Sequence, residues 1–156
     1  MPLADFPQNS NRHALETDIE THEPGHSLAR AFYTSPSIYE KDLDRVWGQN
    51  WIWAGHASQV PESGDYFLFE IGPESVIVVR GRTGAIHAHM NVCRHRGSRV
   101  CLEHSGNTGS FTCPYHAWTY NLDGTLFSAR LMDAGIDRAG LGLKPVPPVV
   151  RRRSVP

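Results

Sequence analysis

The chain has 156 residues, of which 40% are hydrophobic and 20% charged, and its formal net charge is −1. These values describe an ordinary globular chain with a sizeable core, and they give no reason to expect a nucleic-acid partner. The longest aliphatic run, Val76 to Val79, is far too short to cross a bilayer, and no signal peptide follows Met1. We therefore expect a cytoplasmic protein without a membrane partner.

The N-terminal third contains a polar arm and one predicted helix. Residues 1–24 are polar, include three prolines and show no sustained periodicity, which predicts a flexible arm. Ser35 and Pro36 have the residue types of a helix N-cap and first helical position. Apolar residues then recur at helical spacing until Gly48. The sequence therefore predicts one N-terminal helix after the arm.

From Trp51 onward the sequence pattern changes to short strands separated by turns. Turn residues such as Gly72-Pro73 and Asp123-Gly124 lie between apolar or alternating segments. The predicted strands are Trp51–Gly55, Asp65–Ile71, Ser75–Arg80, Ala85–Asn91, Ser110–Cys113, Ala117–Asn121 and Thr125–Phe127. Residues 99–109 are expected to form an irregular connection. This pattern is typical of an all-β domain of small stacked antiparallel sheets.

Between Asn91 and Tyr120, two short stretches each offer one thiolate and one imidazole. The first is Cys93-x-His95, and the second, after 17 intervening residues, is Cys113-x-x-His116. Sulfur and imidazole ligands on paired loops predict a metal site. A structural zinc ion and a two-iron cluster of the Rieske type are the two candidates. Zinc sites usually keep their two Cys and their two His together, whereas a Rieske cluster uses two Cys on one iron and two His on the other. The mixed halves favour the [2Fe–2S] cluster.

The motif resembles the Rieske domain of the Rieske non-haem iron oxygenases, in their α subunit. Cys93-x-His95-x-Gly97-Ser98 and Cys113-Pro-Tyr-His-Ala-Trp118 carry the resemblance, and similar residues extend over about 25–150. The N-terminal part most resembles the branch that acts on quaternary ammonium compounds such as betaines and choline. The resemblance implies a Rieske iron–sulfur fold over residues 25–145, with its cluster-binding part at about 88–128. Residues 146–156 would be a truncated linker or tail.

The resemblance also assigns roles to the residues of the motif. Cys93, His95, Cys113 and His116 would hold the cluster, and His116 would be the electron exit. Arg94, Arg96, Gly97, Ser98, Tyr115 and Trp118 would surround it. Respiratory Rieske proteins carry an extra cysteine pair where this chain has Ser98 and Tyr115. Their absence implies the low end of the Rieske range of potentials, about −150 to +300 mV. Cys101, the third cysteine, is expected to be a buried apolar residue.

Oxygenases of this family activate O₂ at a separate iron held by two His and one carboxylate. No histidine follows His116 in these 156 residues, so we expect the electron-transfer module without its catalytic domain. The implied partners are a reductase or ferredoxin as electron donor, and a mononuclear-iron domain of the same or a neighbouring subunit. The α subunits that the chain resembles are commonly homotrimers. A free-standing Rieske ferredoxin and a zinc-stabilised binding module are the alternative functions.

Overall fold

The computed structural model describes residues 17, 19–130, 132, 133, 135, 137–148 and 150. The described part of the chain divides into two compact units, with the division between Ile52 and Trp53. Most of the predicted arm, and Arg151–Arg153 of the predicted tail, lie outside the described residues. The predicted boundaries at residues 24 and 145 remain predictions.

The first unit contains the predicted helix in a shorter form than expected. The helix α3 spans Pro36–Arg45, with Ser35 at its N-cap position and Pro36 as its first residue. A short turn of helix, α2 (Ala31–Thr34), precedes it, and the 3₁₀ turn η1 (Trp47–Gln49) contains Gly48. The last predicted turn is thus a 3₁₀ turn, a common ending for an α-helix.

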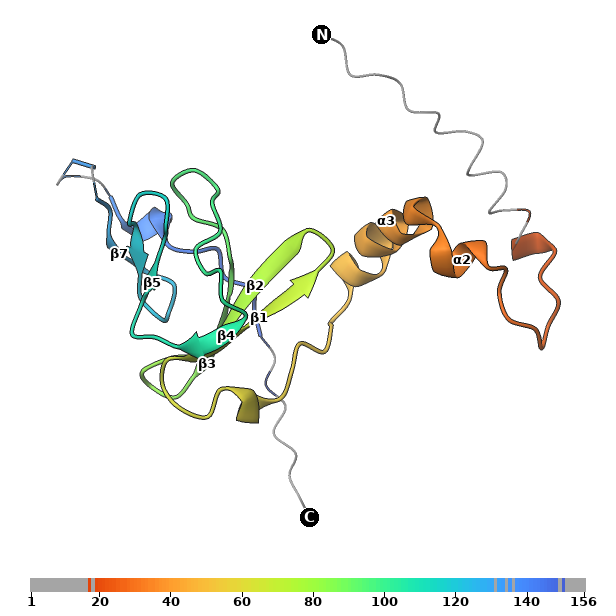
Figure 1. Cartoon of the computed structure of the whole chain (residues 1–156), viewed down its shortest axis with the longest axis horizontal. Coiled ribbons are helices and arrows are strands. Elements are labelled where there is room, and N and C mark those ends of the chain that lie inside the picture. Colours follow the sequence, from red (N-terminus) through yellow and green to blue (C-terminus); the bar gives the residue numbers. More distant parts are fainter. Residues whose placement is uncertain are drawn as a thin grey trace, which may run out of the picture. The chain divides into compact units, whose positions relative to one another are not determined.

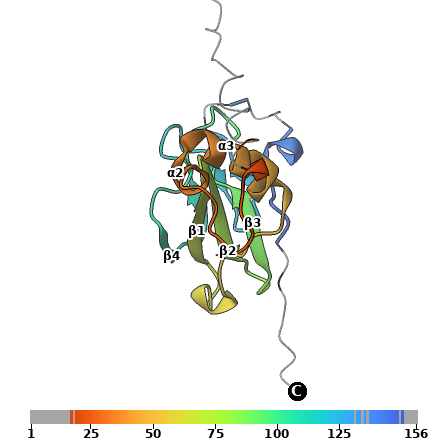
Figure 2. The ribbon, with the colours of Figure 1, turned by 90° about the vertical axis from the view of Figure 1, so that its right-hand side faces the viewer.

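The second unit is built on a four-stranded antiparallel sheet in the order β3-β2-β1-β4 (Figure 1). Three of these strands follow the predicted segments closely: β1 (Asp65–Ile71), β2 (Glu74–Arg80) and β3 (Ile86–Met90). A two-residue turn joins β1 to β2, since Ile71 pairs with Glu74. Figure 2 shows β1, β2 and β3 side by side, with β4 at the edge next to β1.

Two of the strand predictions for this region were wrong. Residues 105–107 form a strand, β4 (Ser105–Asn107), which pairs with β1 although its composition is poor in strand formers. Gly106 fits there because any side chain would come within 3.1 Å of the Tyr66 hydroxyl. Conversely, Trp51–Gly55 is not a strand. Its aromatic residues favour extended structure, but a strand also needs a partner to complete its backbone hydrogen bonds.

A smaller three-stranded sheet carries the second half of the motif. It consists of β5 (Phe111–Thr112), β6 (Thr119–Tyr120) and β7 (Leu126–Ser128), all antiparallel. The two sheets share one hydrophobic core, to which Ile77 and Val79 of β2 contribute from one side and Phe111 and Tyr120 from the other. This arrangement confirms the predicted stack of small antiparallel sheets.

After β7 the chain returns to the free edge of β3. It passes the 3₁₀ turn η3 (Ala139–Leu141), and Leu143 is buried in the core. Pro145 then bridges His89 of β3 in an antiparallel sense. The remaining short element, the 3₁₀ turn η2 (Ala57–Gln59), precedes β1. No helix of the described residues is long and apolar enough to cross a membrane.

Candidate metal centre

The two Cys/His stretches form loops with the same backbone hydrogen bonds. In the first loop the Cys93 N–H donates to the Ser98 carbonyl (2.8 Å), and the Gly97 N–H donates to the Cys93 carbonyl (2.9 Å). In the second loop the Cys113 N–H donates to the Trp118 carbonyl (2.8 Å), and the Ala117 N–H to the Cys113 carbonyl (3.0 Å). Each cysteine is therefore fixed at both its N–H and its C=O in the same six-residue frame. We call residues 93–98 the first loop and 113–118 the second loop.

The fourth residue after each cysteine has a positive φ angle. Gly97 has φ +74° and Ala117 has φ +57°. A left-handed conformation is ordinary for glycine and costs about 1–2 kcal/mol for a residue with a Cβ atom. No other protein atom lies within 4 Å of a Cβ built on Gly97, so the positive φ angle is the observed reason for a glycine at this position.

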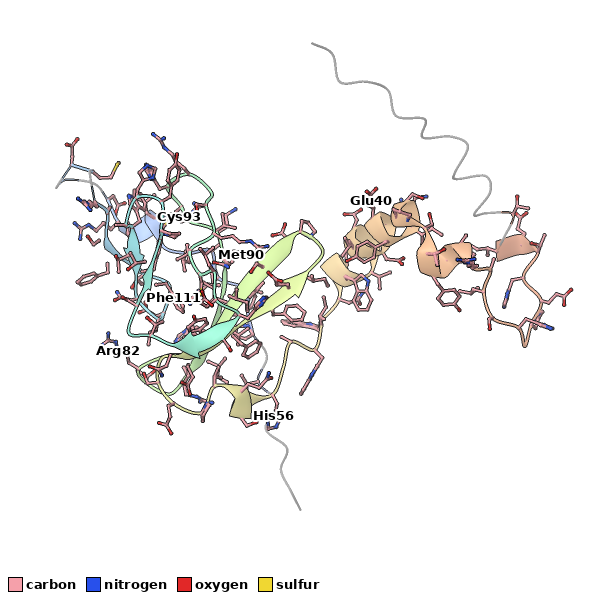
Figure 3. All side chains as sticks on the ribbon, viewed as in Figure 1. Glu40, His56, Arg82, Met90, Cys93 and Phe111 are labelled. Atoms are coloured by element: carbon pink, nitrogen blue, oxygen red, sulfur yellow. The ribbon has the colours of Figure 1, made fainter. Side chains whose placement is uncertain are left out.

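The frames bring the four predicted ligand side chains to one end of the second unit. Met90, at the end of β3, and Cys93, three residues later, are labelled in Figure 3 where the sheet gives way to the first loop. Both thiols are buried, whereas His95 and His116 are half-buried. The two imidazole rings meet edge to face, with centroids 4.7 Å apart. The cysteines thus occupy the interior side of the site, and the histidines lie nearer to solvent.

Aromatic rings cover the histidines unequally. The indole of Trp118, which is buried, stacks on His95 with centroids 4.9 Å apart and planes 9° apart. The ring of Tyr115 lies against His116, with centroids 3.8 Å apart, but it is 59% exposed. His95 is therefore enclosed by a core side chain, while His116 has a surface side chain as its neighbour.

Three arginines in and beside the first loop differ in what they contribute to the site. Arg96 is exposed, and its charge acts on His116. Arg99, by contrast, forms an ion pair with Glu70 (2.8 Å), so its charge is already compensated. Arg94 is held through its backbone, since its N–H donates to the Tyr120 hydroxyl (3.0 Å).

Tyr120 is a site residue that the sequence analysis did not identify. It is completely buried, and its hydroxyl oxygen lies 3.2 Å from the sulfur of Cys93. Because that oxygen accepts the Arg94 N–H, its own proton is available for the Cys93 sulfur. Burial, and then the Cys93 hydrogen bond, raise the pKa of Tyr120, which keeps the phenol protonated. Tyr120 of β6, in the second sheet, thus contacts a thiol of the first loop.

Asn91 is a second residue whose role was not foreseen. Its amide is completely buried and contacts Ser75 of β2, and Val100 and Cys101, which follow the first loop. A buried asparagine with this many partners is hard to predict, because they lie 9, 10 and 16 residues away in the sequence.

The donor set fits a Rieske cluster. The Nδ1 atom of His116 is buried and has no hydrogen-bond partner among the described residues. Desolvation, and then the nearby His95 and Arg96, lower the pKa of His116, which favours the neutral imidazole that binds metals. No three His, Cys, Asp or Glu side chains of the described residues converge as they would around a single ion. A Rieske centre does not require three such side chains around one ion, because each of its irons takes only two protein ligands.

The third cysteine, Cys101, and the buried His89 make contacts that indicate structural roles. Cys101 is buried, as expected, and its sulfur contacts the Glu103 carbonyl at 3.6 Å. His89 is hydrogen-bonded through Nε2 to the Leu122 carbonyl at 3.1 Å. Neither side chain is grouped with the four candidate ligands.

Comparison with known proteins supports the interpretation of the motif. The family model of the Rieske [2Fe-2S] domain matches residues 50–147. The glycine betaine monooxygenase oxygenase subunit of Chromohalobacter salexigens is 39% identical over 143 residues, which is 91% of this chain and 32% of that protein. The biphenyl 2,3-dioxygenase subunit alpha of Rhodococcus jostii is 44% identical over 96 residues, which is 62% of this chain and 21% of that protein.

Solved structures show the same relationship. Naphthalene 1,2-dioxygenase from Rhodococcus sp. superimposes with a TM-score of 0.76 at 33% identity, over 88% of this chain and 32% of that chain. A quaternary ammonium Rieske monooxygenase in complex with L-carnitine gives a TM-score of 0.66 at 35% identity, over 74% of this chain and 33% of that chain. The chain spans between about a fifth and a third of the length of these relatives, and it matches the Rieske part of oxygenase α subunits. Its fold and motif make it a member of the Rieske [2Fe–2S] domain family, whose cofactor is a [2Fe–2S] cluster.

Proposed function

We propose that the chain is the electron-input part of a Rieske oxygenase α subunit, which delivers single electrons to a mononuclear-iron catalytic domain. The observation that carries the proposal is the pair of matched loops, which brings two buried thiols and two half-buried imidazoles to one end of the domain. When bound, the cluster supplies one-electron chemistry. A reductase or ferredoxin would be the donor, and the catalytic iron would lie in the same or a neighbouring subunit.

Within this proposal the four ligand residues have two different tasks. Cys93 and Cys113 would bind one iron in the interior, where burial keeps water and oxidants away from the thiolates. His95 and His116 would bind the other iron near the surface. Neutral imidazoles in place of two thiolates leave the site less negative and raise its reduction potential. The two Nδ1 or Nε2 atoms not bound to metal would be the groups nearest to a redox partner.

His116 is the better candidate for the electron exit. One face of His95 is covered by the buried indole of Trp118, whereas the aromatic neighbour of His116 is the exposed Tyr115. Electron transfer between proteins needs a short path, so the imidazole with the more open surroundings is favoured. A His116 variant that still passed electrons at the wild-type rate would contradict this assignment.

The substrate class that we propose is a quaternary ammonium compound. The betaine-oxidising relative matches over 91% of the chain, and so includes the helical unit, whereas the biphenyl-oxidising relative matches over 62%. The substrate itself would bind in a catalytic domain and not among these residues. The proposed assembly is a trimer, in which the exit of one subunit faces the catalytic iron of the next.

The test begins with the purified chain, supplied with iron and sulfide. We expect two irons and two sulfides per chain, a brown colour, and a rhombic paramagnetic resonance signal after uptake of one electron. The reduced protein is then mixed in separate experiments with the catalytic domain of a glycine betaine monooxygenase and with that of a biphenyl dioxygenase, and the oxidation of glycine betaine by the first mixture is compared with the oxidation of biphenyl by the second. Consumption of glycine betaine alone supports the full proposal.

Other outcomes would select an alternative function. A colourless protein containing zinc would contradict the electron-transfer role and support the binding module. A brown monomer that passes electrons between a reductase and a complete oxygenase, but does not complement the catalytic domain, would indicate a free-standing ferredoxin. Sedimentation measurements of the complemented complex test the trimer.

A further inference from the structure

The side chain of Asn91 closes the first loop at its base. Its Nδ2 group donates to the Cys101 carbonyl (2.7 Å) and to the Ser75 hydroxyl (3.2 Å). Its Oδ1 atom accepts the N–H groups of Val100 (3.0 Å) and Cys101 (2.8 Å). Both donors and both lone-pair directions of the amide are therefore used. The backbone N–H of Asn91 adds a bond to the Ser75 carbonyl (2.8 Å), so the residue is tied to β2 as well.

The second loop is closed in a different way. Its base is the ladder between β5 and β6, in which Phe111 pairs with Tyr120 and Thr112 with Thr119. The first loop leaves β3 at Met90, and the residues that return from it, Val100 and Cys101, belong to no strand. The amide of Asn91 thus makes the cross-chain bonds that a strand pair makes for the second loop.

The bonds of Asn91 lie out of reach of bulk water. The residue has no solvent exposure, and Cys101 and Ser75 are buried beside it. Removal of the amide would leave two backbone N–H groups and a carbonyl without partners in the interior, which is costly. The loop could regain those partners only by moving. Such a movement would displace Cys93 and His95, which lie between residues 91 and 100.

We propose that Asn91 is a positioning residue, which holds the first loop in the frame that Cys93 and His95 need to bind the cluster. The inference rests on the proposed function, because it concerns the ligands of that same site. It goes beyond that function because it makes the positions of two of the four proposed ligands depend on an amide that is not itself a ligand. No comparable side chain is needed at the second loop, whose ladder does the same work.

The experiment compares Asn91→Ala with Asn107→Ala in the full chain. Asn107 is a control for the loss of amide bonds at an exposed site, because its Nδ2 group also donates two bonds, to the Ser63 carbonyl and to Asp65, but at the β1–β4 edge. For each variant we would measure iron and sulfide content, the rate of cluster loss from the visible absorbance, the paramagnetic resonance signal and the midpoint potential. We expect Asn91→Ala to lose its cluster about tenfold faster than wild type or more. Its resonance signal and potential should also shift, whereas Asn107→Ala should match wild type in all four.

Each outcome decides the inference. A cluster in Asn91→Ala with the wild-type lifetime, signal and potential would overturn it, and so would an equal effect of Asn107→Ala. If Asn91→Ala does not fold, Ser75→Ala decides, since it removes one of the four side-chain bonds and leaves the three to residues 100 and 101. A loss rate raised about threefold supports the inference, and an unchanged rate contradicts it. A wild-type chain that takes up no iron and sulfide would overturn the proposed function and the inference together, before any variant is compared.

Discussion

The first and second loops share one backbone frame but differ in almost everything that supports it. Both fix a cysteine through its N–H and its C=O, and both turn through a residue with positive φ. The first uses a glycine for that turn and a buried amide at its base, whereas the second uses an alanine and a strand ladder. The frame is therefore what the metal site requires, and the supporting residues are two separate solutions to the same requirement.

The position of the histidine is the second difference between the loops. It is the second residue after Cys93 but the third after Cys113. In equal frames these positions face different ways, and the two imidazoles consequently meet at 75° to one another. Only the histidine of the second loop has an exposed aromatic neighbour, Tyr115. Because the histidine stands one position later in the second loop than in the first, the two imidazoles have unequal surroundings.

The largest effect on cluster binding is expected at Cys93 and Cys113, the positions at which the two loops should be equivalent. Cys93→Ser and Cys113→Ser should each abolish cluster binding, because both frames exist to present a thiolate. Cys101→Ser should retain full iron and sulfide content, although Cys101 is also buried and free. Metal and sulfide analysis of the three purified variants checks this prediction. Loss of the cluster in Cys101→Ser, or its retention in only one of the other two, would break the equivalence of the loops.

A smaller effect on the cluster is expected where Tyr120 of β6 contacts the first loop. Tyr120→Phe removes the hydroxyl that bonds the Cys93 sulfur and the Arg94 N–H. A hydrogen bond to a thiolate stabilises the reduced, more negative cluster more than the oxidised one. Its removal should lower the midpoint potential, by roughly 40 mV for each 1 kcal/mol of differential stabilisation. A redox titration followed by paramagnetic resonance measures the change.

Tyr66→Phe is the control for that measurement. Tyr66 is also a nearly buried tyrosine of the core, but its hydroxyl lies beside Gly106 of β4. Tyr66→Phe should therefore leave the midpoint potential unchanged. If the two variants shifted the potential equally, the hydroxyl of Tyr120 would have no specific effect on the first loop.

The two positive-φ positions allow a test of opposite signs. Gly97→Ala should lower the free energy of unfolding by about 1 kcal/mol, because a Cβ atom is strained at φ +74° although there is space for it. Ala117→Gly should raise the free energy of unfolding by less than about 1 kcal/mol, because relief of strain is partly offset by a more flexible unfolded chain. Urea unfolding of both variants measures these changes. Equal signs would show that the two turns are not equivalent.

Much of this site was predictable from residue types and spacing, since they indicate its local chemistry. The Cys/His spacing predicted the metal class, and alternating apolar residues predicted β1, β2 and β3 within one residue of each observed end. The short strands of the second sheet followed from turn residues such as Asp123-Gly124. These signals are short in range, because each depends on neighbours a few positions away.

The features that were missed depend on contacts distant in sequence. Nothing in the type of residue 117 indicates a positive φ angle, and the bonds of Asn91 and Tyr120 reach 9 to 27 residues away. The strand β4 contains Gly106 and Asn107, and only its pairing with β1 makes it a strand. The error at Trp51–Gly55 is the reverse case, in which residue types favour a strand but no pairing exists among the described residues.

The smallest expected effect is a pH dependence of stability at the turn that follows β6 in the second sheet. His89, two residues before Asn91 on β3, holds the turn that follows β6 through the Leu122 carbonyl, and its ring fills the space beside Gly124. The carbonyl requires a proton on Nε2, and Nδ1 is buried without a partner among the described residues. Desolvation lowers the pKa of His89 below its ordinary 6.5, and His87 adds to this, while the Leu122 bond and Asp123 oppose it. Asn91, the anchor of the first loop, does not titrate.

The sign of the pH effect follows from the lowered pKa. Above about pH 7.5 the histidine is neutral in both states, and its contribution to stability is constant. As the pH falls below 6.5 the unfolded chain takes up a proton that folded His89 resists, so the free energy of unfolding declines until the folded state is protonated too. His89→Gln, whose amide can still donate to the Leu122 carbonyl, should lose less stability than wild type between about pH 7.5 and 5.5, as measured by urea unfolding. His87→Gln should change the profile in the same direction but by less, since His87 stacks on His89 and only adds to the lowering of its pKa. Parallel pH profiles for wild type and His89→Gln would mean that His89 does not make the stability of this turn depend on pH.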